Sequence, residues 1–147
     1  HIAAGALGLV LGPIAMLAAK RPGTHTRTGE AYHWVMLAIC VSAALLSVLD
    51  WARIWWFLLI AVGSYAFALA GYVAAKRRWR GWLRTHIAGQ GGSYIAMMTA
   101  ILVVNWFLLT GTRGVASPWA WALPTLIGSP LIAWVSYQVR LGKRPKL

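Results

Sequence analysis

The chain carries little charge, and almost none of it is negative. Only 11% of its 147 residues are charged, against about 25% in an ordinary soluble domain. Its only carboxylates are Glu30 and Asp50, both near the ends of apolar runs, and ion-coupled transport usually needs an ionisable group deep in the membrane. Hydrophobic residues make up 60% of the chain, more than one compact core of this size can bury. The excess is expected to face lipid.

Other familiar signals are also missing. The single cysteine, Cys40, excludes an intrachain disulfide and is predicted to be a small buried hydrophobe. No serine stands near a histidine–carboxylate set, no HExxH spacing occurs, and no glycine loop of the phosphate-binding kind is present. An enzyme function other than redox therefore has no candidate residues.

Five apolar stretches approach the roughly 20 residues that a helix needs to cross a hydrocarbon core about 30 Å thick. They are 1–19, 31–50, 54–75, 86–110 and 118–139. Helices satisfy their own backbone hydrogen bonds in lipid, and the alternating strands of a membrane barrel do not occur. The sequence predicts an all-α single domain over 1–147, a polytopic membrane protein with a bundle of five transmembrane helices.

The basic residues are distributed unevenly between the connectors of these spans. The first connector, the third connector and the C-terminal tail hold 12 of the 14: Lys20, Arg21, Arg27, Lys76, Arg77, Arg78, Arg80, Arg84, Arg140, Lys143, Arg144 and Lys146. Only Arg53 and Arg113 fall in the other connectors. The positive-inside rule then predicts the N-terminus outside and the C-terminus in the cytoplasm. The basic inner face is expected to attract anionic lipids or an acidic partner surface, and nucleic-acid binding is not expected.

Glycines and prolines within the spans predict how the helices pack and bend. Gly8 and Gly12 have the spacing that lets two membrane helices approach closely, either within the chain or against a partner. Pro13, Pro124 and Pro130 interrupt helical hydrogen bonding and predict bends. One functional hypothesis is therefore a non-catalytic accessory or scaffold subunit of a larger membrane protein complex.

The histidines support a second hypothesis. His33 and His86 each lie near the start of a span that begins at the inner face, so they are expected at similar depth. We expect them to serve as axial ligands of a b-type haem that transfers electrons, with Arg27 and Arg84 pairing with its propionates. The competing interpretation is that both imidazoles are interfacial groups hydrogen-bonded to headgroups or a neighbouring helix.

A simpler metal site is a third option for the same end of the protein. His25, His33 and His86, with Glu30, provide three or four ligands of the kind that zinc accepts. The spacing HxxxH does not occur to support it. His1 stands apart at the outer face, so a second haem is not expected.

Several of these segments together resemble an uncharacterised family of small bacterial multi-pass membrane proteins. The segments that carry the resemblance are 1–5, 25–32, 86–95 and 124–130, with Thr99 and Asn105. The resemblance implies a bacterial inner (plasma) membrane location and brings no established activity. The histidines also resemble those of four-helix transmembrane cytochromes, although the second, outer pair found in many of those is absent here.

The beginning of the chain carries two further expectations. It starts at His1 rather than methionine, so a few residues are expected to precede it. Residues 1–19 have no charged segment before them and are not expected to be a signal peptide.

Overall fold

The computed structural model describes residues 1–20 and 23–142, and all regular structure within them is helical. The elements are α1 (Ile2–Leu17), α2 (Thr24–Leu49), α3 (Trp51–Ile54), α4 (Trp56–Arg77), α5 (Trp82–Thr110), the 3-10 turn η1 (Gly114–Ala116) and α6 (Pro118–Arg140). Every predicted span is thus a helix, and the all-α prediction is confirmed for the described residues.

Two helices begin earlier than the apolar pattern predicted. α2 starts at Thr24 rather than at residue 31, and α5 starts at Trp82 rather than at residue 86. The added segments include Arg27, Glu30 and Arg84, which are good helix formers, so helical hydrogen bonding begins before the apolar run starts. His25, Arg27 and Arg84 consequently lie on helices and not in connectors.

Three helices, not five, are long and apolar enough to cross a membrane by length and composition within the described residues: α2, α4 and α5. α1 is apolar but has only 16 residues, which at about 1.5 Å per residue falls short of a core about 30 Å thick. α6 has 23 residues, yet it includes Pro124, Pro130 and several polar side chains and has no stretch as hydropathic as those of α2, α4 and α5. Both helices continue through their internal prolines.

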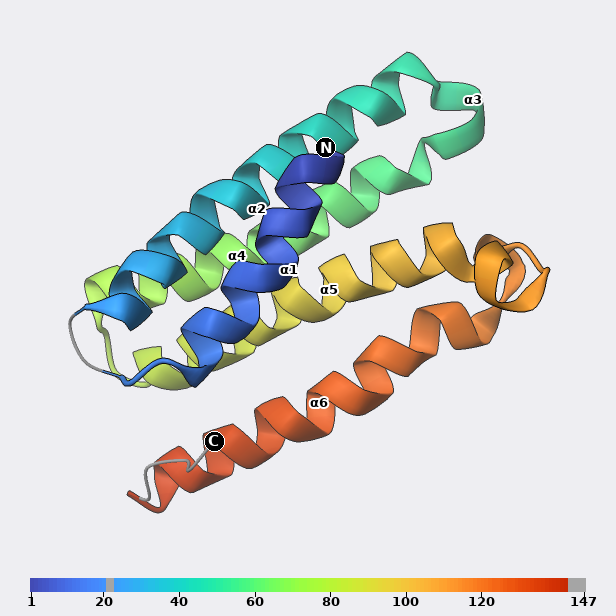
Figure 1. The fold of residues 1–147 in the computed structure, drawn as a ribbon. Helices are drawn as coiled ribbons and strands as arrows, with labels where there is room; N and C mark the ends of the chain where they lie inside the picture. The colour runs from blue at the N-terminus through green and yellow to red at the C-terminus, as the bar shows by residue number, and fades with distance from the viewer. Residues whose placement is uncertain (21–22, 143–147) are drawn as a thin grey trace.

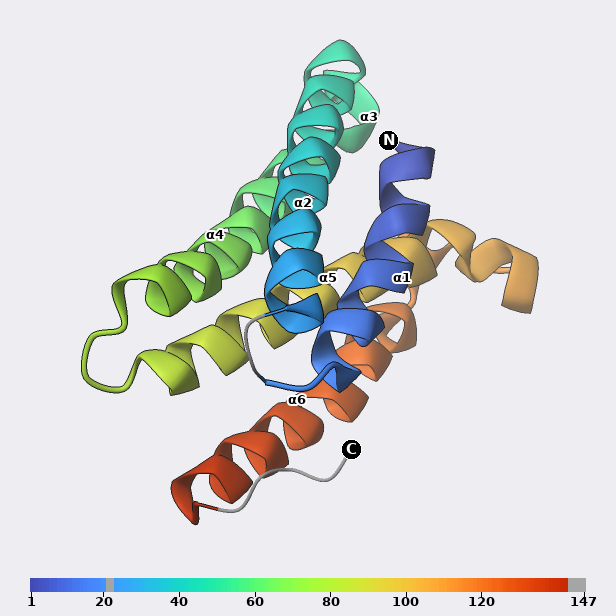
Figure 2. The ribbon, with the colours of Figure 1, turned by 60° about the vertical axis from the view of Figure 1, so that its left-hand side comes forward.

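The long helices run up and down in chain order. α1 packs on α2, α2 on α4, α4 on α5 and α5 on α6, with a smaller contact between α1 and α5. Figure 1 shows the α1–α2 connection, the α4–α5 connection and the end of α6 gathered at one end of the bundle, and Figure 2 shows the same arrangement from another side.

This arrangement separates the charges between the two ends of the molecule. The end that holds the α1–α2 and α4–α5 connections, called the basic end below, carries Lys20, Arg27, Lys76, Arg77, Arg78, Arg80, Arg84 and Arg140. The opposite end carries Arg53, which forms a 2.7 Å ion pair with Asp50, and Arg113. The predicted tail residues Lys143, Arg144 and Lys146, and Arg21, lie outside the described residues.

The core is built on α2, α4 and α5. Tyr32, Met36 and Cys40 of α2 are buried in one cluster with Ala68 of α4 and Met97 of α5, which confirms the predicted burial of Cys40. The α1 glycines belong to this packing, because a Cβ at position 8 would lie 2.9 Å from the Met97 sulfur. Gly12 likewise faces Tyr94, at 2.5 Å. The small-residue face of α1 is therefore used inside the chain.

Candidate functional site

Two histidines from different helices meet at the basic end. The rings of His25 on α2 and His86 on α5 have centroids 6.2 Å apart and planes at 85° to one another. His25 Nδ1 lies 2.7 Å from the carbonyl oxygen of Ala15, and His86 Nδ1 lies 2.9 Å from that of Gly71. Because a carbonyl only accepts, both Nδ1 atoms must donate, which leaves Nε2 of each neutral ring with a free lone pair. We call these two residues the imidazole pair.

The last turn of α1 supplies the partner of His25. Ala15 is among the final four residues of α1, whose carbonyls have no partner within the helix. His25 and Lys20 both donate to the Ala15 oxygen, and Lys20 also donates to Met16. This cap at the C-terminus of α1 fixes the orientation of the His25 ring. Partial desolvation in this position lowers the pKa of the Lys20 ammonium.

A backbone contact between α4 and α5 supplies the partner of His86. A Cβ at Gly89 would lie 2.6 Å from the Gly71 nitrogen and 2.6 Å from the Phe67 oxygen. Only glycine allows helices to approach this closely. The approach brings His86, one turn before Gly89, within hydrogen-bonding distance of the Gly71 carbonyl. The sequence analysis missed Gly71, although small residues recur at helical spacing on this face of α4, at Ala61, Ser64, Ala68, Gly71 and Ala74.

His33, the other predicted haem ligand, lies in a different environment. Its side chain is 4% exposed, and its ring stacks on Tyr72 of α4 with centroids 4.0 Å apart and planes at 9°. The centroid of the Tyr65 ring lies 5.8 Å from that of the His33 ring. His33 Nδ1 is buried and has no hydrogen-bond partner among the described residues.

The structure therefore brings His86 beside His25 and gives His33 another set of neighbours. The ring neighbours of His86 are His25 and Trp82, whereas those of His33 are Trp34, Tyr65 and Tyr72. Within the part of the chain that the structure describes, no three His, Cys, Asp or Glu side chains form a group that could hold a metal ion. The predicted set of His25, His33, His86 and Glu30 is thus not gathered into one site.

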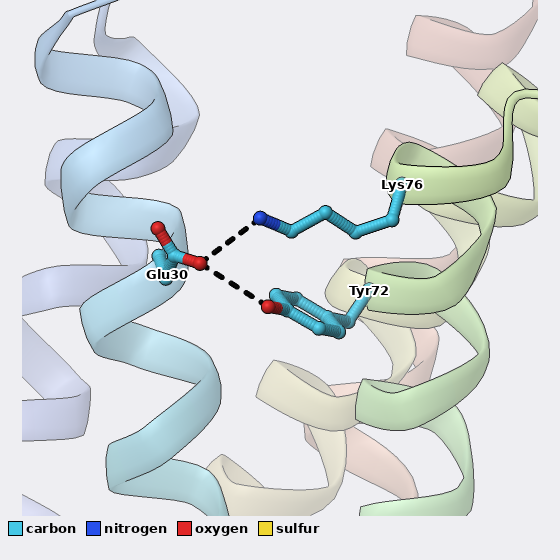
Figure 3. Close-up of polar contacts among 3 residues, drawn as sticks. All are labelled: Glu30, Tyr72 and Lys76. Carbon is cyan, nitrogen blue, oxygen red and sulfur yellow. Dashed lines mark hydrogen bonds and ion pairs between the residues drawn. The ribbon is translucent and has the colours of Figure 1, made fainter.

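Glu30 instead links α2 to α4, as Figure 3 shows. Its Oε1 atom accepts hydrogen bonds from the Tyr72 hydroxyl at 3.1 Å and from Lys76 Nζ at 3.0 Å. The Lys76 ammonium also lies 5.2 Å from the centre of the Tyr72 ring. Sequence reasoning missed this cluster because its members lie 42 and 46 residues apart.

The two predicted arginines flank the imidazole pair in sequence. Arg27 follows His25 by two residues and Arg84 precedes His86 by two, and both side chains are exposed. Arg84 also lines a cavity of about 480 Å³ with Thr85 and Ser136. A larger cavity of about 620 Å³ lies between α4, α5 and α6. Neither cavity is lined by a histidine.

Comparison with protein families, curated proteins and solved structures finds no match to this chain. The resemblance to small bacterial multi-pass membrane proteins accordingly stays a prediction. What the structure supports is the helical architecture, with three helices apolar and long enough to cross a membrane in the described part of the chain.

Proposed function

We propose that this chain is a bacterial inner-membrane protein that crosses the bilayer five times, with its N-terminus outside and its C-terminus in the cytoplasm. The segregation of the basic residues to one end supports this orientation. Many large apolar side chains are exposed along the helices, among them Leu59, Val104 and Leu108, as lipid contact requires. The short α1 is accommodated by local thinning of the bilayer and by Lys20 extending to the interface.

Within that membrane protein, the function supported best is binding of haem b for electron transfer, and His25 and His86 are the residues that would hold it. The imidazole pair carries this proposal. Two imidazoles on one metal, each bonded at about 2.0 Å, have ring centres roughly 6 Å apart, close to the 6.2 Å separation found here. Each ring also has its Nδ1 tied to a carbonyl, as metal-ligating histidines usually do.

The ring contacts of His33 argue against it as the second haem ligand. Its ring neighbours are Trp34, Tyr65 and Tyr72, and the ring of His86 is not among them in the described part of the chain. His25 occupies the position next to His86 that the sequence analysis assigned to His33. We therefore keep His86, Arg27 and Arg84 from the predicted haem site and replace His33 by His25.

The residues around the pair suit the rest of the cofactor. Arg27 and Arg84 supply exposed guanidinium groups that pair with carboxylates such as haem propionates. The haem, when bound, supplies one-electron chemistry at a potential that axial imidazoles and burial set. Since neither cavity adjoins the pair, binding requires the side chains around the two rings to move apart.

Visible absorption of the detergent-purified protein tests this proposal. The wild type, produced in cells with ample haem, should show a Soret band that sharpens on reduction with dithionite. His25→Ala and His86→Ala should each remove it, whereas His33→Ala, at the third inner histidine, is the matched control and should retain it. A band that depends on His33 and not on His25 would restore the original ligand pair. A colourless wild type would refute haem binding.

An accessory role in a larger complex is the alternative function. α6 has no stretch as hydropathic as those of the three span candidates and still exposes Leu126, Ile127 and Leu131, a surface that a partner helix would cover. The glycines of α1 do not serve this role, because they pack inside the chain. Ile127→Ala with Leu131→Ala should then release a stoichiometric partner that His25→Ala retains, as measured by native mass spectrometry of the mildly solubilised complex.

A further inference from the structure

Two neighbouring cavities lie along the α4–α5–α6 side of the molecule, and together they are called the groove below. Both are lined by Phe67 and Ala88. The smaller cavity lies toward the basic end, where Arg84 and Ser136 line it. The larger cavity continues between the three helices, which lie side by side in Figure 1, as far as Trp121 near the start of α6.

The length of the larger cavity is close to that of one leaflet of a bilayer. Its lining positions on α5 run from Ala88 to Ala100, which at a rise of about 1.5 Å per residue is roughly 18 Å. Half of a hydrocarbon core about 30 Å thick is about 15 Å. A single acyl chain that enters from the smaller cavity would thus reach along the whole of the larger one.

The groove is apolar along most of its length and polar at the basic end, which matches the tail and the head of an amphiphile. The larger cavity is lined mainly by Gly, Ala, Ile and Phe, with the hydroxyls of Ser64, Thr99, Thr125 and Ser129. The smaller cavity has the guanidinium of Arg84 beside the hydroxyls of Thr85 and Ser136. Neither is lined by Glu30 or Asp50, the two carboxylates of the chain. An anionic head with an apolar tail fits this order.

The groove exists because side chains are missing where α4 faces α6. A Cβ at Gly63 would meet nothing within 4 Å, although helix interfaces are normally close-packed. At Gly92 on α5, by contrast, a Cβ would lie 3.1 Å from the Phe67 ring of α4. The α5 wall of the groove is therefore already in contact with α4 at this position. Gly63 is therefore a position where a larger side chain fills the groove without displacing the protein.

We propose that this groove binds one anionic phospholipid, with its phosphate at Arg84, Thr85 and Ser136 and one acyl chain between α4, α5 and α6. Guanidinium and hydroxyl groups together recognise phosphate oxygens, and a basic face next to the membrane concentrates anionic lipid. The inference rests on the membrane placement proposed above; it shares Arg84 with the proposed haem site and requires neither histidine of the imidazole pair.

Native mass spectrometry of the full chain in micelles, titrated with phosphatidylglycerol or with phosphatidylcholine of the same chains, tests the groove. The wild type should retain one phosphatidylglycerol with about fivefold preference over phosphatidylcholine, the effect expected for one cation near a charged headgroup. Gly63→Leu should lose the bound lipid. Arg84→Gln should keep a lipid and lose the preference.

Matched variants distinguish lipid bound in the groove from lipid adsorbed nonspecifically elsewhere on the protein. Ala66→Leu adds the same side chain to α4 at an exposed position outside the groove. Arg80→Gln removes an exposed arginine of the α4–α5 connection, four residues before Arg84. Both variants should bind lipid like the wild type. Equal retention by all variants, equal retention of the two lipids by the wild type, or a dimer that excludes lipid would each overturn the proposal. Gly63→Leu should also keep any haem spectrum, so the two proposals fail separately.

Discussion

Gly71 and Gly89 bring α4 and α5 into backbone contact, and this single contact positions His86. A Cβ at Gly89 would lie 2.7 Å from the Cα of Gly71, so the two helices can approach only where both lack side chains. The carbonyl of Gly71 then accepts the His86 Nδ1 hydrogen at 2.9 Å. The first prediction follows directly from this contact.

Gly89→Leu should destabilise the protein and misplace His86. The added side chain forces α4 and α5 apart, and overpacking of this kind costs about 1–3 kcal/mol. Thermal unfolding in detergent should show a lower midpoint. Gly29→Leu is the control, because a Cβ at Gly29 on α2 meets nothing within 4 Å; it should unfold at or above the wild-type temperature. Equal midpoints for the two variants would contradict the close approach.

His33→Phe should stabilise the protein or leave it unchanged. The phenyl ring keeps the stacking on Tyr72 and removes the buried Nδ1, which has no hydrogen-bond partner in the described part of the chain. An unsatisfied buried polar group costs about 1–3 kcal/mol. His33→Ala removes the ring as well and should lower the unfolding midpoint. If His33→Phe proves as unstable as His33→Ala, the imidazole makes an interaction that the structure does not show.

The link between Glu30 and Lys76 should contribute little to stability. Both side chains are about half exposed, at 43% and 54%, and exposed ion pairs typically contribute about 0–1 kcal/mol. A double-mutant cycle with Glu30→Gln and Lys76→Met should give a coupling energy in that range, smaller at high salt. Tyr72→Phe tests the second hydrogen bond to Glu30 separately. A coupling energy several times larger would mean that this pair lies in a dry environment.

The proposed orientation predicts which end of the bundle is accessible from outside. In a Cys40→Ala background, Thr112→Cys places a thiol at the end that holds Arg113, and Arg80→Cys places one at the basic end; both positions are exposed. A membrane-impermeant maleimide should label the first variant in intact cells and the second only after permeabilisation. The reverse pattern would invert the topology.

The sequence by itself determined the helices and the direction of the charge asymmetry. Helical hydrogen bonds are local, so each apolar run predicted a helix. The early starts of α2 and α5 and the short elements α3 and η1 lie outside these runs. The clusters of basic residues at alternate connections also predicted a basic end. Both features depend on residues close together in the chain.

Only the tertiary structure decided which side chains meet. The helices are apolar on nearly every face, so periodicity does not show which face packs against a neighbour. Same-side placement allowed any two of His25, His33 and His86 to pair. The rotation of α2, the cap on Ala15 and the Gly71–Gly89 contact selected His25 and His86. The pair arises from how the helices cross, and crossing depends on shape complementarity between segments distant in sequence.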